Sequence, residues 1–575
     1  MRHYNPSEIE PKWQQIWADD QRYHTNESSA KPKYYVTGMF PYPSGAGMHT
    51  GHFMEHSIVD AVARFRRALG YNVMYPIGWD SFGLPAENYA IKTGRKPRET
   101  TADNIANFKK QLRSVGASID WSREINTSDP EYYKWTQWIF TKLFEKGLAY
   151  QKESLQWWCP KDKTVLANEQ VIDGKCWRCD SVVVKKSMKQ WFFRITAYAE
   201  QLLAELPEMD WPDKIKIAQT NWIGKSEGAE ITFQVDGSDD TITVFSTRPD
   251  TIFGATFLVL APEHPLARTL LTDETRELVE NYINDAVKKS EIERSNDTKE
   301  KTGVFSGSYA INPATGQKIP IWIADYVLGG YGTGAVMGVP AHDDRDFAFA
   351  EKFELPVVEV IERPEDNIDT DACYNGEGVL VNSGAFDGTR SEDAREQIVA
   401  WLEQEGKGKS QITYKMRDWL ISRQRYWGAP IPIIYCPEHG AVPVPESDLP
   451  VLLPDVDDFQ PRGDGRSVLA AQEDWVQTTC PVCGSPARRE TDTMDGYACS
   501  SWYLLRYTDP HNTQQAWAPD KANYWAPLDM YVGGDHATAH LLYVRFWTHV
   551  FCELGLTDFA EPVKKLVYHG LIQAE

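Results

Sequence analysis

The segment PYPSGAGMHTGH, residues 41–52, constrains the fold of this chain more than any other stretch. It follows PKYYVTGMF (residues 32–40), whose short apolar run is typical of a buried strand. Pro and Gly then interrupt regular structure, and a pattern of apolar residues with helical spacing follows, up to a stop signal at Gly70. The order of strand, loop and helix places His49 and His52 at the start of a helix.

The residues alone leave three interpretations of these two histidines. A helix N-terminus offers N–H groups and the positive end of a dipole, which suits an anion such as a phosphate. Imidazoles at this place could donate to phosphate oxygens as charge builds up during phosphoryl or nucleotidyl transfer. Two surface histidines on a loop are the second interpretation. A metal pair is the weakest, because His-x-x-His without further ligands is poor evidence for zinc.

Length and composition indicate a multidomain globular protein. The chain has 575 residues, of which 42% are hydrophobic and 25% charged. A formal net charge of −22 argues against broad nonspecific nucleic-acid binding, although it does not exclude a local basic groove. The N-terminus has no apolar signal-peptide core and no apolar run is long enough for a membrane span, so we expect a cytoplasmic protein without a membrane partner.

Nine cysteines are too few for a disulfide scaffold in a chain of this length. Cys436-x2-His439 and Cys480-x2-Cys483 form two close pairs of soft or imidazole ligands, flanked by the Pro and Gly that knuckle turns favour. These four side chains would complete the tetrahedral coordination of a zinc ion, so no position remains open for a substrate or a water molecule. The pattern therefore predicts a structural Zn²⁺ site, with free thiols as the alternative.

A second group of cysteines, Cys159, Cys176 and Cys179, offers only three thiols. Asp162 occupies the position where a C-x-x-C partner of Cys159 would fall. Zinc with an aspartate as fourth ligand and a degenerate, metal-free knuckle are both compatible with this spacing.

Several further motifs carry a resemblance to a known family. HTGH matches the HIGH signature of class I aminoacyl-tRNA synthetases, and MFPYPSG (residues 39–45) resembles its leucine-specific form. GWDSFGLPAENYA (residues 78–90) resembles the GWDAFGLPAE segment of the same family, whereas isoleucine and valine enzymes typically have GWDCHGLPIE there. The other similar stretches are TVLANEQV (164–171), NWIGKSEG (221–228), STRPDTIFG (246–254), YGTGAVMGVPAHDDRD (331–346), RDWLISRQRYWGAPIP (417–432) and SSWYLLRY (500–507). From residue 4 to its end, the chain thus resembles the leucyl-tRNA synthetases.

The resemblance implies an α/β fold. It consists of a Rossmann-like parallel-sheet catalytic domain, an inserted mixed α/β editing domain and zinc-knuckle modules. The implied segments are 1–155 (catalytic domain, first half), 156–190 (first Cys-rich module), 191–224 (connector), 225–415 (editing domain), 416–435 (return to the catalytic domain), 436–490 (second zinc module) and 491–575 (catalytic domain, second half). The family often has zinc in the first Cys-rich module, which favours metal there.

The resemblance also implies the reaction and its residues. Leucine is activated by ATP, bound with Mg²⁺, to leucyl-adenylate and is then transferred to the 3′ end of tRNA(Leu). The implied catalytic residues are His49 and His52, which would contact the ATP phosphates, and Gly51, which would allow close approach. The implied leucine-pocket residues are Phe40, Tyr42, Asp80, Tyr497, Ser500, His536 and His540. Asp80 would pair with the substrate ammonium, as suits a buried carboxylate.

Gly533 and Gly534 would lie near the nucleotide, and Asp535 near its ribose. The family usually has GGxEHA, whereas this chain has the shorter GGDHA, and Cys499 stands where the family usually has an acidic residue. His536 and His540 are four residues apart, so we expect them on one face of a helix.

In the family, the insertion hydrolyses mischarged tRNA. A single pocket separates amino acids that differ by one methylene only weakly, so a second sieve is needed. The implied editing residues are Thr247, Arg248, Thr251 and Asp346: Thr251 would exclude leucine sterically, and Asp346 would hold the ammonium of the wrong amino acid. By itself, TRPDT is also an ordinary strand-to-turn sequence.

The family's second catalytic signature, a Lys-rich KMSKS loop, is expected shortly after LVYHGLIQAE, where the sequence stops. KKSMK (residues 185–189) looks similar to this signature, but it falls between the first Cys-rich module and QWFFRITAYA (residues 190–199). We therefore interpret it as a solvated charged stretch. The sequence therefore predicts either a truncated form or one subunit of a split enzyme, and in the second case a separate C-terminal polypeptide would be a further partner. In both cases we expect poor leucine activation by this chain alone. Two other hypotheses are a synthetase for another branched or sulfur-containing amino acid and a non-catalytic tRNA-binding relative.

Overall fold

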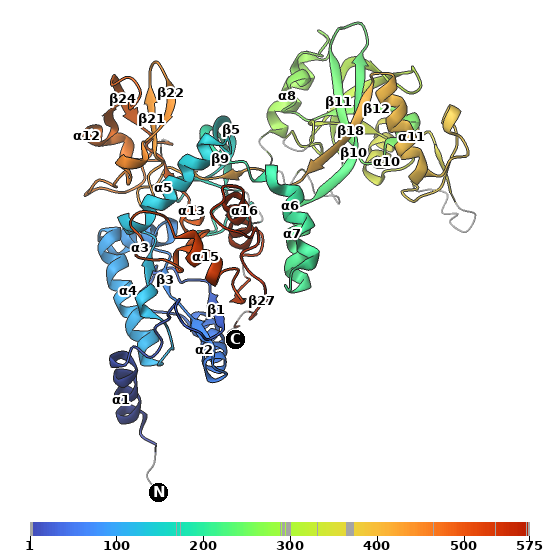
Figure 1. The fold of residues 1–575 in the computed structure, drawn as a ribbon. Helices are drawn as coiled ribbons and strands as arrows, with labels where there is room; N and C mark the ends of the chain where they lie inside the picture. Colours follow the sequence, from blue (N-terminus) through green and yellow to red (C-terminus); the bar gives the residue numbers. More distant parts are fainter. Residues whose placement is uncertain are drawn as a thin grey trace. The chain divides into compact units, whose positions relative to one another are not determined.

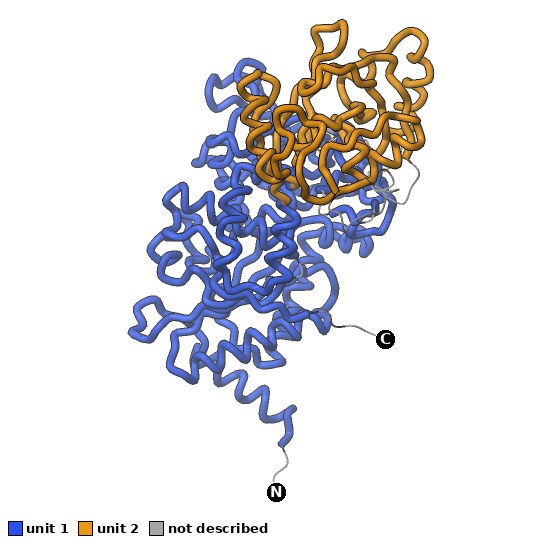
Figure 2. The backbone as a smooth tube through the Cα atoms, turned by 90° about the vertical axis from the view of Figure 1, so that its right-hand side faces the viewer, with its two compact units in different colours: residues 1–223, 416–575 blue, residues 224–415 orange. Residues whose placement is uncertain are grey.

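The computed structural model of the chain describes residues 4–167, 170–172, 174–287, 289, 294, 301–329, 332–363, 373–463, 465–534, 536–570 and 572. It contains two compact units (Figure 2): unit 1 comprises residues 1–223 and 416–575, and unit 2 comprises residues 224–415. None of the helices in the described part of the chain combines the length and apolar character needed to cross a bilayer.

The centre of unit 1 is a parallel sheet with the strand order β2-β1-β26-β27. Strands β1 and β27 are labelled in Figure 1. Its strands are β1 (Lys33–Gly38), β2 (Asn72–Met74), β26 (Met530–Val532) and β27 (Leu566–Val567). The predicted strand within residues 32–40 is thus confirmed. In the register of β1 and β26, Val36 faces Met530, so segments from distant parts of the chain lie side by side.

Helix α2 (Thr50–Ala68) follows β1 through the Gly/Pro loop, as the apolar spacing predicts. It packs on β1, β2 and β26, and its buried Val59 and Ala63 are one helical turn apart. Helix α4 (Pro97–Ser114) contributes apolar side chains to the same core cluster. The loop between β1 and α2 therefore lies at the carboxyl edge of the sheet, where open α/β sheets bind their ligands.

A second, antiparallel sheet of unit 1 has the strand order β19-β9-β5-β6. Its strands are β5 (Ala149–Cys159), β6 (Thr164–Leu166), β9 (Val184–Phe193) and β19 (Trp419–Leu420). Because Trp419 pairs with Phe193, the chain that returns from the insertion joins a sheet built by the first half of unit 1.

The KKSMK stretch lies in β9, where its residues are exposed or half-buried. Lys185 and Lys186 place their ammonium groups 3.7 and 4.3 Å from the ring centroids of Trp157 and Trp158 on the paired strand β5. The lysine stems cover aromatic rings while the charges remain near water, which is compatible with the interpretation of KKSMK as a solvated charged stretch.

Further secondary structure of unit 1 surrounds these two sheets. Its other helices are α1 (Pro6–Asp19), α3 (Leu84–Thr93), α5 (Pro130–Glu145), α6 (Ala199–Ala204), α7 (Asp213–Ile223), α12 (Glu473–Val476), α13 (Gly496–Ser500), α14 (Tyr503–Arg506), α15 (Pro519–Trp525) and α16 (His540–Glu553). Its short strands are β3 (Gly78–Trp79), β4 (Ile125–Asn126), β7 (Val171–Ile172), β8 (Lys175–Cys176), β20 (Ser422–Arg423) and β25 (Thr493–Met494). A small sheet, β22-β21-β24-β23, consists of β21 (Ile433–Cys436), β22 (Gly440–Pro443), β23 (Gln477–Thr479) and β24 (Pro486–Arg489).

Unit 2 is built on one mixed sheet with the order β11-β10-β13-β14-β12-β15, and β18 pairs with β10 beyond this path. Its strands are β10 (Lys225–Val235), β11 (Thr241–Ser246), β12 (Phe257–Leu260), β13 (Gly303–Ile311), β14 (Lys318–Ala324), β15 (Ala335–Gly338) and β18 (Gly408–Tyr414), with a separate pair β16 (Ile361–Glu362) and β17 (Val379–Leu380). The helices of its described part are α8 (Arg276–Ala286), α10 (Asp344–Phe353) and α11 (Ser391–Gln404). Strands β11 and β15 lie close together although they stand at opposite ends of the order, so the sheet is curled.

The chain passes between the two units at two points that are neighbours in space. Met416 donates its backbone N–H to the Ile223 carbonyl at 3.1 Å, and Lys415 donates to the Gly224 carbonyl at the same distance. From there the paired strands β10 and β18 run together into unit 2.

Candidate functional site

The HTGH motif forms the first turn of α2 and its cap. His49 is the N-cap residue: its Nδ1 accepts the His52 N–H at 3.4 Å, and the His52 Nδ1 accepts the His49 N–H at 3.3 Å. The two rings stack with centroids 3.6 Å apart. Because each Nδ1 accepts a hydrogen bond, each neutral ring carries its proton on Nε2 and offers one N–H donor.

Burial, and after it the neighbouring His49, lowers the pKa of His52 to about 3, so this imidazole is neutral at physiological pH. Gly51 lies between the two rings in sequence, and a Cβ at this position would lie 3.1 Å from ring atoms of His49. A larger residue at Gly51 would therefore disturb the stacked pair.

These residues line a pocket of about 490 Å³ in unit 1. The pocket brings together six residues that the resemblance implied for different parts of the reaction, and it adds others that the sequence analysis did not select. The predicted residues in its wall are Phe40, Tyr42, His49, Gly51, His52 and His536. The sequence analysis missed Glu55 and His569, because Glu is ordinary on a helix surface and a lone His carries no motif.

Gly533 and Gly534 follow β26 with φ angles of 153° and 130°, which favour glycine at both positions. A Cβ on either one would lie 2.8 Å from the ring of Tyr531 or of Tyr568. Gly533 also donates its N–H to the Val567 carbonyl at 2.9 Å. The predicted ribose residue Asp535 lies outside the described residues.

Asp80 follows β3 and is completely buried. Neither of its carboxylate oxygens accepts a well-formed hydrogen bond from the described part of the chain. Burial raises the pKa of Asp80 well above its usual value, while the nearby hydroxyls of Ser500, Tyr42 and Thr127 lower it in part. An anion in this position has a strong need for a cationic partner.

Other predicted pocket residues surround this carboxylate. Tyr497 and Ser500 lie on the short helix α13, whose N-terminus is capped by the Asp495 side chain through a 2.7 Å bond to the Tyr497 N–H. Phe40 stacks on Tyr503 with centroids 4.0 Å apart and an interplanar angle of 7°. The acid that the family usually has is replaced by Cys499, which is fully buried beside these groups; burial raises the pKa of its thiol.

The prediction that His536 and His540 share a helix is wrong. Helix α16 begins at His540, because Ala539 before it has φ −117° and ψ −94°, outside the helical region. His536 precedes the helix, and its ring centroid lies 6.1 Å from that of Tyr497. His540 is buried with its Nε2 3.4 Å from the Tyr503 hydroxyl, and burial lowers its pKa to about 3.

Unit 2 contains the second group of predicted site residues. Thr247 and Arg248 follow β11, and Thr251 lies in the adjoining turn, where its Oγ1 donates to the Arg248 carbonyl at 2.8 Å. The guanidinium of Arg248 binds the buried Asp250 through Nε and Nη2, at 3.1 and 2.8 Å. Thr251 is itself only 1% exposed.

Asp346 lies in the first turn of α10, and its Oδ2 accepts the Val339 N–H at 2.9 Å. Burial, and after it the neighbouring Asp343, raises the pKa of Asp346 to about 7. This carboxyl group is therefore poised between its two protonation states at physiological pH.

A short segment connects the two predicted editing stretches. Arg248 donates to the Asn375 carbonyl at 3.3 Å, and the Asn375 amide donates to Asp344 at 2.6 Å. His342, in the HDDRD stretch, shares a 2.8 Å bond with the Tyr374 carbonyl. The structure thus brings the TRPDT and HDDRD stretches to the same segment, residues 374–376.

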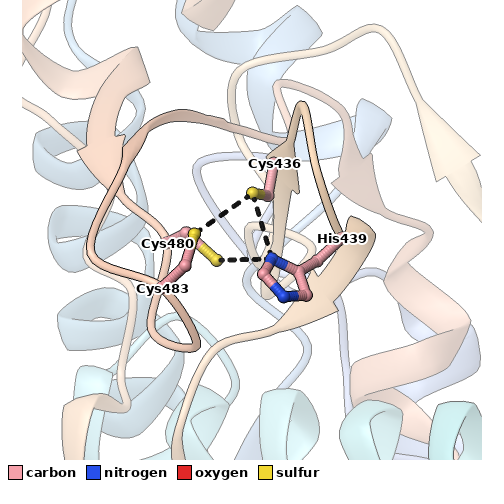
Figure 3. A group of neighbouring side chains, drawn as sticks. All are labelled: Cys436, His439, Cys480 and Cys483. Carbon is pink, nitrogen blue, oxygen red and sulfur yellow. Dashed lines mark hydrogen bonds between the residues drawn. The ribbon is translucent and has the colours of Figure 1, made fainter.

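Figure 3 shows the cluster of Cys436, His439, Cys480 and Cys483 in unit 1. The Cys436 sulfur lies 3.5 Å from the His439 Nδ1 and 3.7 Å from the Cys483 sulfur, and the Cys480 sulfur lies 3.9 Å from the same Nδ1. A tetrahedral zinc ion with these ligand types separates neighbouring ligand atoms by roughly 3.5–3.8 Å. Hydrogen bonds from Ser485 lower the pKa of Cys483 to about 6, which favours its thiolate. The donor set and its geometry fit Zn²⁺.

The second cluster joins Asp162 to Cys159, Cys176 and Cys179. The Asp162 Oδ2 lies 3.4 Å from the Cys159 sulfur and 3.3 Å from the Cys176 sulfur. Its other oxygen accepts a 3.0 Å hydrogen bond from Asn88 on α3. Three sulfurs and one oriented carboxylate oxygen also make a four-ligand set that is consistent with zinc.

The parallel sheet, the capped HTGH turn and the pocket beside it define a class I aminoacyl-tRNA synthetase. The family model for tRNA synthetases class I (I, L, M and V) matches residues 12–232 and 392–575, and the model for the leucyl-tRNA synthetase editing domain matches residues 220–403.

Similarity to individual relatives identifies the family within this class. Leucine–tRNA ligases from Thermotoga maritima and Thermotoga petrophila are each 53% identical over 577 residues, which covers 100% of this chain and 70% of each relative. A solved structure described as the ternary complex of Agrobacterium radiobacter K84 agnB2 LeuRS, tRNA and LeuAMS is similar with a TM-score of 0.88 and 41% identity, over 98% of this chain and 68% of that chain. The chain therefore belongs to the leucyl-tRNA synthetases, the leucine–tRNA ligases with an inserted editing domain.

Proposed function

We propose that Asp80 binds the ammonium group of leucine during activation of the amino acid. The observation that carries this proposal is a completely buried carboxylate without a well-formed hydrogen bond to the described residues. A substrate cation supplies the missing charge, and the nearby hydroxyls of Ser500 and Tyr42 lower the pKa of the carboxyl group. Phe40, Tyr497, His536 and His540 form the surrounding wall that receives the isobutyl group.

The histidines of the HTGH turn bind the ATP phosphates in this proposal. Each ring offers an Nε2–H donor, and the helix N-terminus adds its own positive potential. When the leucine carboxylate attacks the α-phosphorus and pyrophosphate leaves, these donors stabilise the charge that develops on the phosphate oxygens. Gly533 and Gly534 give the nucleoside room, because the positions have no Cβ. Mg²⁺ enters with ATP as part of the substrate.

Calorimetric binding of non-hydrolysable aminoacyl-adenylate analogues tests these assignments. We expect the leucyl analogue to bind more tightly than the isoleucyl, valyl and methionyl analogues. Asp80→Asn should weaken all four, because all four contain the ammonium group. A chain that binds the four analogues equally well would contradict the assignment of the leucine pocket.

Unit 2 hydrolyses mischarged tRNA in this proposal. Thr251 closes the pocket to the leucyl side chain, and Asp346 in its ionised form receives the ammonium group of the wrong amino acid. Arg248 shapes the site through Asp250 and the Asn375 carbonyl. Release of amino acid from isoleucyl-tRNA(Leu), but not from leucyl-tRNA(Leu), is the expected result of a deacylation assay.

Zn²⁺ supplies a structural cross-link in both cysteine clusters in this proposal. Metal analysis of the purified chain should give two zinc ions, and Cys480→Ser should remove one of them. Asp162→Ala should remove the other and leave the Cys436 site occupied. A chain that keeps both ions after Asp162→Ala would exclude the carboxylate as a ligand.

A further partner in this proposal is tRNA(Leu). The solved relative in complex with tRNA supports this partner.

A further inference from the structure

Helix α7 carries a polar residue in the middle of its buried face. Ile215, Gln219 and Ile223 follow one another at spacings of four residues, so they lie on one face of the helix. All three are at most 1% exposed, and Gln219 is completely buried. A buried amide costs free energy unless its donor and its acceptor are both hydrogen-bonded. The partners of Gln219 therefore indicate why this position is not apolar.

One end of the Gln219 amide faces Arg545 on α16, which is also completely buried. The Nε and Nη2 of Arg545 bind the Glu561 carboxylate at 2.9 and 2.6 Å. Its Nη1 donates to the Gln219 Oε1 at 2.8 Å. Because a guanidinium can only donate, this contact fixes the orientation of the amide. The NH₂ group of Gln219 must therefore point away from Arg545.

This NH₂ group holds a turn beside the pocket at the HTGH motif. The Gln219 Nε2 donates to the Ala537 carbonyl at 2.8 Å. Ala537 belongs to the turn of residues 536–539 and directly follows His536, which lines the pocket. The backbone of Ala539 departs from helical φ and ψ angles, so the regular structure of α16 does not extend through the turn. A contact from another element therefore contributes to the position of His536.

The same face of α7 also approaches the glycine pair that precedes the turn. A Cβ at Gly534 would lie 3.4 Å from the Ile215 Cδ1, which is a close van der Waals contact. Ile215 and Gln219 thus contact the segment between β26 and α16 at Gly534 and at Ala537. Helix α7 supports this segment from behind, through one apolar contact and one directed hydrogen bond.

We propose that Gln219 is a positioning residue of the synthetic site, which acts through the Ala537 carbonyl on the turn that carries His536. This inference rests on the pocket proposed above for leucine and ATP. Gln219 is completely buried behind the turn and does not line the pocket, so it does not itself touch the substrate. Arg545 and Glu561 keep its NH₂ group directed at the turn.

Gln219→Glu tests the donor alone. The substitution keeps the size of the side chain and its acceptor toward Arg545, but it places a second acceptor against the Ala537 carbonyl. We expect an unfolding midpoint near that of the parent chain, because the new carboxylate faces a guanidinium. The affinity for leucyl-sulfamoyl-adenosine, measured by calorimetry, should fall roughly 5- to 150-fold, as expected for a buried carbonyl that loses its donor.

Gln14→Glu is the matched control. It makes the same exchange opposite another backbone carbonyl, because the Gln14 Nε2 donates to the Ser114 carbonyl at 3.0 Å. Gln14 lies on α1 and does not line the pocket at the HTGH turn. This variant should retain the parent affinity for leucyl-sulfamoyl-adenosine.

Gln219→Met removes both hydrogen bonds at similar side-chain length. We expect a similar loss of affinity together with a lower unfolding midpoint, because the Arg545 Nη1 also loses its acceptor. Hydrogen exchange adds a local measurement on the chain without ligand. In both Gln219 variants the amides of residues 536–541 should exchange faster than in the parent, while those of α2 should keep the parent rates.

Two results would overturn the inference. In the first, the Gln219 variants fold and bind leucyl-sulfamoyl-adenosine as tightly as the parent chain. In the second, they bind it more weakly although the amides of residues 536–541 exchange as in the parent, which shows a general structural role. If the parent chain does not bind this ligand, the proposed pocket is wrong, and hydrogen exchange still decides whether Gln219 holds the turn.

Discussion

Asp80 in unit 1 and Asp346 in unit 2 are both buried carboxyl groups with raised pKa values, and we propose that both bind an ammonium group. They differ in the neighbouring groups that stabilise their ionised forms. Asp80 is fully buried beside side-chain hydroxyls and the Asp495 carboxylate, whereas Asp346 accepts a backbone N–H and lies in the first turn of a helix. The helix N-terminus and the N–H stabilise the anion of Asp346, so its pKa rises only to about 7.

This difference shows how one chain can use the same chemical group in two ways. The proposed synthetic site holds a carboxylate that accepts no well-formed hydrogen bond from the described residues. The proposed hydrolytic site holds one that the backbone already stabilises, so its state depends on pH as well as on the ligand. Four predictions test this comparison.

Asp80→Asn should produce the largest effect. Removal of one partner of a buried charge pair costs about 2–5 kcal/mol, so the affinity for the leucyl-adenylate analogue should fall roughly 30- to 5,000-fold. Calorimetry measures this change. Asp346→Asn is the matched control, and an equal loss in both variants would end the distinction between the two sites.

Asp346 should make the stability of the chain depend on pH. Its pKa of about 7 in the folded state is above the ordinary 3.8, so folding favours the protonated form. The free energy of unfolding should therefore fall as pH rises through this range, by about 3 kcal/mol between about pH 5 and pH 8. Asp346→Asn should remove this part of the slope. Urea titrations at both pH values provide the measurement, and equal slopes in the two chains would show that Asp346 is ionised throughout.

Thr251→Ala should open the hydrolytic pocket to leucine. Discrimination by one methyl or methylene group amounts to about 1–3 kcal/mol, so leucyl-tRNA hydrolysis should rise roughly 10- to 200-fold. Thr251→Ser keeps the hydroxyl that bonds to the Arg248 carbonyl and removes only the methyl group. If Thr251→Ser remains inactive on leucyl-tRNA while Thr251→Ala is active, the hydroxyl contact and not the methyl group excludes leucine.

Ser500→Ala should give the smallest effect. Its hydroxyl lowers the pKa of Asp80, and a single hydrogen bond contributes about 0.5–1.5 kcal/mol. We expect a loss of analogue affinity of roughly 2- to 12-fold, which recovers in part at higher pH as Asp80 ionises. The neighbouring Ser501→Ala is the control, because its hydroxyl donates to the Tyr497 carbonyl. Equal losses in the two variants would indicate a general disturbance of α13.

Local sequence patterns predicted the elements that local interactions determine. The apolar run before Gly38 and the helical spacing after His49 correspond to β1 and α2. The pairing of Val36 with Met530 has no local signal, because it depends on contacts between segments that are far apart in the sequence. Only the resemblance of the whole motif series implied that these segments form one site.

The residues of the candidate site could be predicted from the sequence to the same degree as the fold. Residues inside distinctive motifs, such as His52 and Asp80, could be selected, whereas Glu55 could not, because only the fold places it in the pocket wall beside Gly38 and His569. The prediction of one helix that contains both His536 and His540 was wrong for a related reason. A spacing of four residues is compatible with a helix but does not reveal that the backbone at Ala539 departs from it.

The chain leaves unit 1 after Ile223 and returns to it at Met416, and these two points are adjacent. Their adjacency has a consequence for how such a molecule can evolve. A backbone hydrogen bond joins these two residues, so the whole insertion leaves and re-enters its host as a hairpin would. Removal or replacement of the insertion would require a bridge of only about 5 Å, the spacing of paired strands. A genetic exchange at this one place could transfer the proofreading unit between host enzymes as a cassette, while the order of strands in the host sheet stays the same.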